Sequence, residues 1–161
     1  MSAVAAEEYT AIVAGGGIAG MATAVALART GWRVTVLERA PAFGEVGAGL
    51  ALTMNGMAAV DALGVGDAVR AAGFRTASTG FQDQAGRWLV RLPAEQTGRD
   101  AITTIWGQHR QRLHAVLHQA AAAAPGVELV TGAEVSAVRP GRPGGDRAEV
   151  TWRRDGQTHE A

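Results

Sequence analysis

The sequence predicts an α/β fold built on a parallel β-sheet. Residues 9–14 form a short apolar run that ends in glycines, as strands buried on both faces do. Residues 18–29 follow with the small and apolar residues of a helix, and residues 32–38 with the β-branched residues of a second strand. This strand–helix–strand unit of about thirty residues has the length that a right-handed parallel crossover requires.

The elements of this unit have recognisable ends. Gly31 follows the helical residues and predicts where the helix stops, and the second strand ends at Glu38. Residues 39–53 are rich in glycine and contain Pro41, which predicts a long loop without regular structure. Loops of this length inside compact domains are usually functional, so we expect this one to contribute to a binding site.

The middle of the chain predicts two short helices followed by an antiparallel hairpin. The helices cover residues 55–63 and 67–72, are interrupted by Gly64, and have Asn55 and Asp67 as expected N-caps. Between residues 75 and 93 the pattern changes to alternating runs joined through Gly86, which is typical of a hairpin. The two hairpin strands are predicted at residues 79–82 and 88–92.

The last part of the chain predicts one long helix and further strands. The helix runs from about His109 to Ala123, ends before Pro125, and should pack an apolar face on the sheet. That face consists of Leu113, Val116, Leu117 and Ala120. Three strands are predicted at residues 127–131, 134–139 and 149–154, and Asp155–Gly156 is expected to form the turn of another hairpin.

Composition excludes several classes of function. The 161 residues are 47% hydrophobic and 19% charged, as in compact domains, and 15 basic residues balance 15 acidic ones, so we expect no nucleic-acid partner. Every basic residue is Arg, which excludes the lysine of a nucleoside triphosphatase phosphate loop and Schiff-base chemistry. The absence of cysteine excludes disulfides and thiolate sites and is compatible with a cytoplasmic protein.

Neither a secretory signal nor a membrane span is predicted. Residues 1–9 contain two glutamates and no basic residue, unlike the start of a secretory signal. Residues 11–28 are uncharged, but the three glycines at positions 15–17 would each cost about 1 kcal/mol inside a helix. This run is better explained as a strand followed by a helix, so we expect no membrane partner.

The most specific motif is Gly15-x-Gly17-x-x-Gly20, placed between the first strand and the first helix. In this context the glycines permit a tight turn, close approach of backbone amides to a pyrophosphate, and close packing of helix and sheet. Glu38, eighteen residues beyond Gly20, would accept hydrogen bonds from an adenosine ribose, which argues against a 2′-phosphate at this site. The alternative is a glycine-rich turn with a surface glutamate.

Three weaker signals remain open on the residues alone. Arg110 lies near the start of a helix, where a cation opposes the helix dipole, so either an anion lies nearby or the side chain is simply solvated. The small residues at positions 45–52 would let a flat ring approach the backbone, but on composition alone an ordinary flexible loop explains them better. His114 and His118 have the spacing of metal ligands without a third partner, and we expect them on a half-exposed helix surface without a role.

Together these segments resemble the group A flavoprotein monooxygenases, the FAD-dependent aromatic-ring hydroxylases typified by salicylate hydroxylase and p-hydroxybenzoate hydroxylase. The resemblance covers nearly the whole chain, and its one local departure is Met54, where relatives commonly have Pro. The matching sequence segments are the glycine motif with Glu38-Arg39, then Gly47-Ala48-Gly49-Leu50 with Asn55-Gly56, then residues 62–68, and finally His109-Arg110-x-x-Leu113-His114.

The resemblance implies a Rossmann-like FAD-binding domain and assigns roles to individual residues. Gly15, Gly17, Ile18, Ala19, Gly20, Glu38 and Arg39 would bind the ADP half of FAD. Ala48 and Gly49 would lie near the flavin, and Arg110 would contact the ribityl and pyrophosphate region. Val135 would border the adenine. No catalytic side chain is assigned, because in this family the cofactor performs the chemistry.

The resemblance also implies that the chain is the N-terminal portion of a longer enzyme. The family's later Asp-Gly and Gly-Asp segments and most of its substrate sheet are not in residues 1–161, and Asp155–Gly156 is not the family's Asp-Gly segment. We therefore expect the chain alone to be incomplete and inactive, and to require a complementary C-terminal segment or chain. The expected division is an FAD-binding unit at 1–74, a β-hairpin of the substrate layer at 75–105, and a continuation of the FAD-binding domain at 106–161.

The function implied is hydroxylation or epoxidation of a small aromatic substrate with O2 and NADH or NADPH as transient electron donor. Two other functions stay open. One is a non-catalytic FAD-binding remnant or module, which the missing segments favour. The other is an NAD-dependent dehydrogenase domain, against which Arg110 and the loop at residues 47–52 argue.

Overall fold

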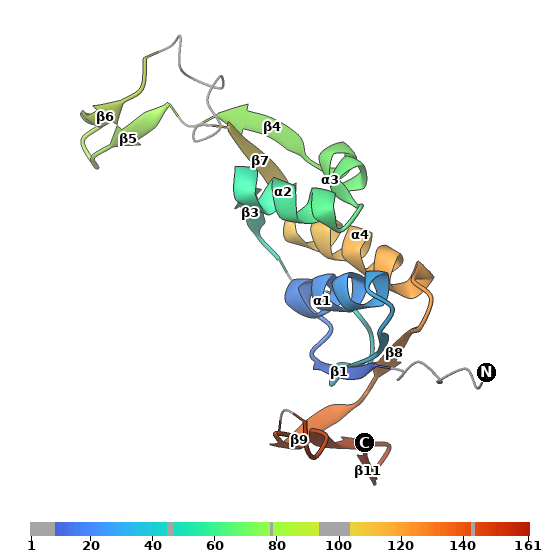
Figure 1. Ribbon diagram of the computed structural model, residues 1–161. Coiled ribbons are helices and arrows are strands. Elements are labelled where there is room, and N and C mark those ends of the chain that lie inside the picture. The colour runs from blue at the N-terminus through green and yellow to red at the C-terminus, as the bar shows by residue number, and fades with distance from the viewer. Residues whose placement is uncertain (1–8, 45–46, 78, 94–103, 143) are drawn as a thin grey trace, which may run out of the picture. The chain divides into compact units, whose positions relative to one another are not determined.

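The computed structural model describes residues 9–44, 47–77, 79–93, 104–142 and 144–161 (Figure 1). Some expectations of the sequence analysis concern residues outside these ranges: residues 1–8, Glu45 and Val46, and most of residues 94–105. The chain divides into two compact units, residues 1–45 with 117–161 and residues 46–116. The predicted division at residues 74 and 105 stays a prediction.

The first unit contains the predicted parallel sheet. Its strands are β1 (Thr10–Ala14), β2 (Arg33–Glu38) and β8 (Val127–Thr131), in the order β1-β2-β8. Both pairings are parallel, with Thr10 opposite Arg33 and Val34 opposite Val127. The carboxyl ends of the three strands therefore lie at one edge of the sheet, where doubly wound folds bind their ligands.

Helix α1 (Ile18–Arg29) connects β1 to β2 and packs against the strands of this sheet. Gly31 ends it with φ of +88°, while the N–H of Gly31 donates to Ala28 O and that of Trp32 to Leu27 O. These two bonds form a Schellman motif, which confirms the predicted stop and turns the chain directly into β2.

The other face of the parallel sheet is covered by an antiparallel sheet, in the order β11-β10-β9. Its strands are β9 (Glu134–Arg139), β10 (Glu149–Arg154) and β11 (Gln157–Glu160). The predicted turn between the last two is present, with φ of +51° at Asp155 and +76° at Gly156, as a type I′ turn requires. Leu37, Ala133 and Val150 are buried between the two sheets.

The second unit contains an antiparallel sheet that the sequence analysis missed. Its strands are β3 (Gly49–Leu52), β7 (Thr104–His109) and β4 (Phe74–Ala77), in the order β3-β7-β4. The prediction that residues 39–53 form a loop without regular structure is therefore wrong for residues 49–52. Residues 49–52 become a strand because β7, more than fifty residues later, supplies their hydrogen-bond partners.

The two short helices are present, but their predicted caps are wrong. Helix α2 (Met54–Ala62) has Thr53 as N-cap and helix α3 (Gly66–Ala72) has Val65, and neither end has a side-chain cap. Asn55 and Asp67 lie one residue inside the helices. The helices start there because the carbonyl oxygens of Thr53 and Val65 accept the first helical hydrogen bonds, from the N–H groups of Met57 and Val69.

Helix α4 (Arg110–Ala123) begins one residue later than predicted, because His109 is still part of β7. Leu113, Leu117 and Ala121 are its buried apolar residues. His114 is only 4% exposed, so the expectation of a half-exposed surface is wrong for this residue, whereas His118 is partly exposed.

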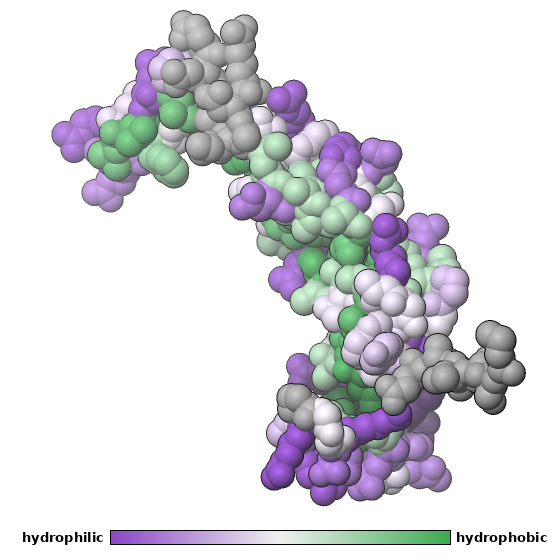
Figure 2. Space-filling view, in the orientation of Figure 1, coloured by the Kyte–Doolittle hydropathy of each residue, from purple (hydrophilic) through white to green (hydrophobic). Residues whose placement is uncertain are grey.

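The predicted hairpin is confirmed as β5 (Gly80–Gln82) and β6 (Trp88–Arg91), which pair antiparallel. It exposes large apolar side chains, seen as green on its surface in Figure 2. Phe81 is 68% exposed and Leu89 69%. A two-stranded hairpin with an open apolar surface has little stability of its own. Its expected role as the first piece of the substrate sheet stays a prediction.

Candidate cofactor site

The site begins at the turn that joins β1 to α1. Gly15 has φ of +104°, which strains any residue with a side chain, and its N–H donates to Leu37 O at 2.8 Å. Gly20 lies directly against this turn, since a Cβ added there would overlap the carbonyl oxygen of Gly15 and approach Val13 Cγ1 to 3.4 Å. The two glycines thus permit the tight turn and the close packing of helix on sheet that the motif predicts.

Helix α1 presents unsatisfied backbone donors at this turn. Gly17 is its N-cap, with extended backbone, and the first intrahelical bond runs from Met21 N–H to Gly17 O at 2.9 Å. The N–H groups of Ile18, Ala19 and Gly20 precede that bond, and Gly17 has no side chain to cap them. Three amides and the positive end of the helix dipole are therefore available to a phosphate oxygen.

Glu38 faces this turn from the end of β2. Its Oε2 accepts from Gly16 N–H at 2.7 Å, and its Oε1 accepts from Ala40 N–H at 2.8 Å. The Ala40 N–H is the main cause that holds the pKa of the Glu38 carboxyl below its ordinary value, and partial burial opposes it. The carboxylate is thus ionised at neutral pH, and its remaining lone pairs can accept ribose hydroxyl hydrogens.

Four of the residues predicted to bind the adenosine half of FAD line one cleft. It has a volume of about 210 Å3 and lies at the carboxyl ends of β1 and β2. Gly15, Glu38, Arg39 and Val135 all border it. The rest of its lining is Ala14, Leu37, Ala133 and Glu134. The structure therefore brings four predicted residues from three separate segments of the chain to the lining of one cleft.

Three residues of this site were missed in the sequence analysis. Gly16 donates to Glu38, and a Cβ there would lie 2.5 Å from the Phe43 ring, so the ring covers the backbone of the turn. The Phe43 ring also lies 5.1 Å from the His118 ring, centroid to centroid. Ala40 contributes only its backbone N–H. The run of three glycines was a signal for Gly16, whereas Phe43 and Ala40 carry no pattern that could have been recognised.

The remaining predicted residues come together in the second unit. Arg110 begins α4 directly after β7, and its N–H donates to Ala48 O at 3.2 Å. Gly49 begins β3 and pairs with His109. A Cβ at Gly47 would lie 2.8 Å from Arg110 Cβ, so the arginine stem rests on the glycine backbone. Ala48, Gly49 and Arg110 thus form one cluster at the end of the β3–β7 pair.

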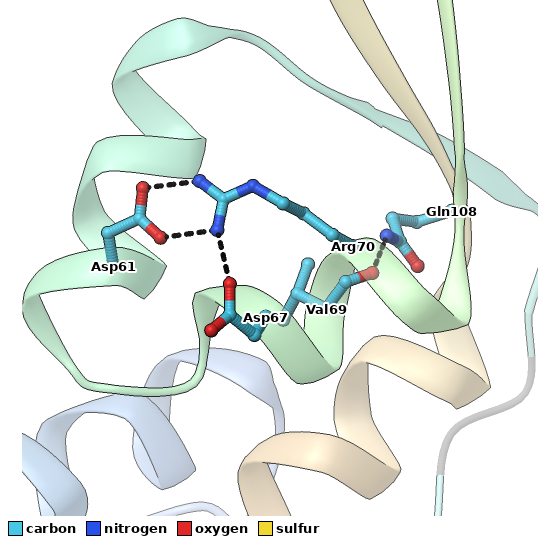
Figure 3. A network of polar contacts seen from close by, with 5 residues as sticks. All are labelled: Asp61, Asp67, Val69, Arg70 and Gln108. Carbon is cyan, nitrogen blue, oxygen red and sulfur yellow. Dashed lines mark hydrogen bonds and ion pairs between the residues drawn. The ribbon is translucent and has the colours of Figure 1, made fainter.

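A polar network holds the scaffold behind this cluster (Figure 3). Arg70 of α3 donates to both carboxylate oxygens of Asp61 of α2, at 2.8 and 2.6 Å, and lies 3.3 Å from Asp67. The bond from Arg70 holds the pKa of Asp61 below its ordinary value. Gln108 of β7 is 3% exposed and donates to Val69 O at 2.6 Å, which ties α3 to the strand that leads into Arg110.

Other kinds of site are not found in the described part of the chain. No three His, Asp or Glu side chains gather closely enough there to hold a metal ion. Across the same ranges, every helix is too short or too polar to traverse a lipid bilayer.

Comparison with known proteins places this geometry in a family. Residues 8–161 match the family described as FAD binding domain. The chain is 39% identical over 131 residues to 3-hydroxybenzoate 6-hydroxylase of Klebsiella oxytoca, a match that covers 80% of this chain and 33% of that protein. It is 37% identical over 135 residues to the aurachin C monooxygenase/isomerase of Stigmatella aurantiaca, covering 84% of this chain and 34% of the other.

The fold is likewise that of solved flavoprotein oxygenases. The structure superposes on 2-methyl-3-hydroxypyridine-5-carboxylic acid oxygenase with a TM-score of 0.75 and 28% identity, over 96% of this chain and 38% of that one. The chain therefore spans about a third of the length of the relatives it matches, at their N-terminal part. On the match over residues 8–161 and the geometry of the first turn, the chain belongs to the FAD binding domain family of FAD-dependent monooxygenases.

Proposed function

We propose that the protein hydroxylates or epoxidises a small aromatic substrate in the cytoplasm with O2 and NADH or NADPH, and that this chain supplies the ADP-binding part of its FAD site. The observation that carries the proposal is the first turn, where Glu38 is bonded to Gly16 beside three uncapped amides. Support for the aromatic substrate comes from relatives such as 3-hydroxybenzoate 6-hydroxylase, whose name states a hydroxylated aromatic acid.

The residues present fit FAD, since Gly15 adopts a backbone angle that a side chain would strain and Gly17 leaves the first amides of α1 without a side-chain cap. In the proposed site the amides of Ile18, Ala19 and Gly20 bind the pyrophosphate, and Glu38 orients the ribose through hydrogen bonds. Val135 and Arg39 border the adenosine. When bound, FAD would accept hydride from the nicotinamide donor and activate O2.

Arg110, Ala48 and Gly49 have a different proposed role, nearer the flavin. The Arg110 guanidinium would bind a phosphate or ribityl oxygen, with its stem held by Gly47. Small residues at Ala48 and Gly49 would let the ring system approach the backbone. No proton transfer is assigned to any side chain of this chain, which instead binds and orients the cofactor.

The test is the visible spectrum of the purified chain together with the C-terminal two thirds of a relative. Retention of a yellow chromophore, and donor oxidation that depends on an aromatic compound, would support the proposal. Tight NAD binding without flavin uptake would instead favour a dehydrogenase domain. Flavin retention without turnover in the assembled protein would favour a non-catalytic FAD-binding module.

A further inference from the structure

We infer that Phe43 is a positioning residue for the adenosine ribose, because its ring covers the hydrogen bond that holds Glu38 to Gly16. The inference rests on the proposed function, since it deepens the role given there to Glu38. It assigns a function to Phe43, which lies outside the glycine motif, and to His118 beside it, and none of the comparisons assigns either.

The Glu38 carboxylate is held by two backbone amides. Gly16 N–H donates to Oε2 at 2.7 Å, and Ala40 N–H donates to Oε1 at 2.8 Å. Ala40 is itself fixed, because its carbonyl oxygen accepts from Gly132 N–H at 2.9 Å. Gly16 belongs to the turn between β1 and α1, so its bond ties the carboxylate to the turn at which the pyrophosphate is proposed to bind.

The Phe43 ring lies beside the bond between Gly16 and Glu38. A Cβ added at Gly16 would lie 2.5 Å from Phe43 Cε1 and 3.1 Å from Glu38 Cβ. The ring and the Glu38 stem therefore lie on the same side of Gly16. Gly16 is buried although glycine has no side chain that could shield its own backbone, and the ring supplies the closest contact on this side.

Covering this bond affects ribose binding in two ways. A hydrogen bond in surroundings of low dielectric constant is electrostatically stronger than one in contact with water. Water also competes for Gly16 N–H, and a carboxylate released from that amide would be free to rotate. With the ring in place, Glu38 keeps one orientation at the cleft and loses less conformational freedom when the ribose binds.

The position of the Phe43 ring is limited by α4. The ring lies 5.1 Å from the His118 ring, centroid to centroid, with an angle of 44° between the two planes. His118 follows Leu117, which is 1% exposed and belongs to the same compact unit as Phe43. The His118 ring is therefore carried by a packed helix, and it supports the Phe43 ring over the turn.

Calorimetric titration with ADP tests whether Phe43 acts through Glu38. Phe43→Ala should raise the Kd for ADP at least about fivefold, whereas Phe43→Leu keeps an apolar cover and should stay close to the wild type. In the Glu38→Ala background, Phe43→Ala should cause no further loss, because the bond that the ring covers is gone. With 2′,3′-dideoxy-ADP, which lacks both ribose hydroxyls, Phe43→Ala should bind as the wild type does.

Tyr9 offers a matched control. Its ring stacks on the Trp32 ring at the same centroid separation of 5.1 Å, but it precedes β1 and so lies at the other end of that strand. Tyr9→Ala should leave the Kd for ADP unchanged. Equal losses in Tyr9→Ala and Phe43→Ala, or additive losses when Phe43→Ala is combined with Glu38→Ala, would overturn the inference.

Amide hydrogen exchange, followed by NMR, tests the cover without any nucleotide. In Phe43→Ala, Gly16 N–H should exchange at least about tenfold faster than in the wild type, while Gly15 N–H, bonded to Leu37 O, should keep its rate. His118→Ala leaves the ring present and should accelerate Gly16 selectively by a smaller factor. Unchanged exchange at Gly16, or equal acceleration of Gly15, would overturn the inference.

The two measurements separate this inference from the proposed function. If Glu38→Ala leaves the Kd for ADP unchanged while Phe43→Ala accelerates Gly16, the ring covers the bond, but the ribose role of Glu38 is rejected, and the positioning role with it. If Glu38→Ala weakens ADP binding while Phe43→Ala alters neither the Kd nor the exchange, the proposed function stands and the positioning role of Phe43 is rejected.

Discussion

Replacing Glu38 with Ala should weaken binding of the ADP half of FAD, and the expected increase in Kd follows from the hydrogen bond that is lost. The variant removes a carboxylate that faces the cleft and is held by Gly16 N–H at 2.7 Å and Ala40 N–H at 2.8 Å. A hydrogen bond to a charged group contributes about 1.5–3 kcal/mol, so loss of the ribose contact should raise the Kd about 10- to 150-fold. Glu38→Gln keeps the shape of the side chain and should fall between the wild type and Glu38→Ala.

The assay is calorimetric titration of the chain with ADP, because all residues of the predicted ADP site belong to the first unit. Glu134→Ala is the matched control, since it removes another carboxylate from the lining of the same cleft. Its Kd should change much less, because no ribose contact is assigned to Glu134. Equal losses in Glu38→Ala and Glu134→Ala, or no loss in either, would refute the assignment of Glu38 to the ribose.

Three further predictions concern the same two clusters. Because the pKa of Glu38 is lowered on folding, its ionised form stabilises the folded state above the ordinary Glu pKa of about 4.3. The free energy of unfolding, measured as a function of pH, should therefore decrease below that pH, and the decrease should be smaller in Glu38→Gln. Gly20→Ala should destabilise the chain by about 1–3 kcal/mol, because its Cβ would overlap a backbone oxygen, whereas Gly44→Ala, in open space, should leave the denaturant midpoint unchanged. In the assembled protein, Arg110→Ala should weaken FAD retention by about 1.5–3 kcal/mol, measured by fluorescence titration, and Arg112→Ala on the same helix should not; equal effects would remove Arg110 from the site.

The strand–helix–strand unit could be predicted from the sequence because its signals are local. Glycines, β-branched residues and the helix stop at Gly31 lie within the segments they define, and α1 has the predicted bounds. β8, β9 and β10 were predicted for the same reason. The parallel arrangement followed from the length of the crossover, which sets the pairing geometry without knowledge of distant partners.

The sheet of the second unit could not be predicted in this way. β3 is four residues long and has two small residues, and β4 and β7 carry no clear alternation. These segments become strands because each finds a partner far along the chain, with Gly49 opposite His109 and Phe74 opposite Gly107. Long-range pairing of this kind leaves little trace in any one segment.

By itself, the sequence determined the path of the chain through the first turn and the residue types that surround it. Gly15 and Gly20 are required there by backbone angle and by contact with the preceding strand, and both requirements are local. Only the tertiary structure decided that Glu38 bonds to Gly16, that the Phe43 ring covers the turn and that Val135 reaches the same cleft. These contacts join segments that lie far apart in the sequence, and they form because parallel strands bring their carboxyl ends to a common edge.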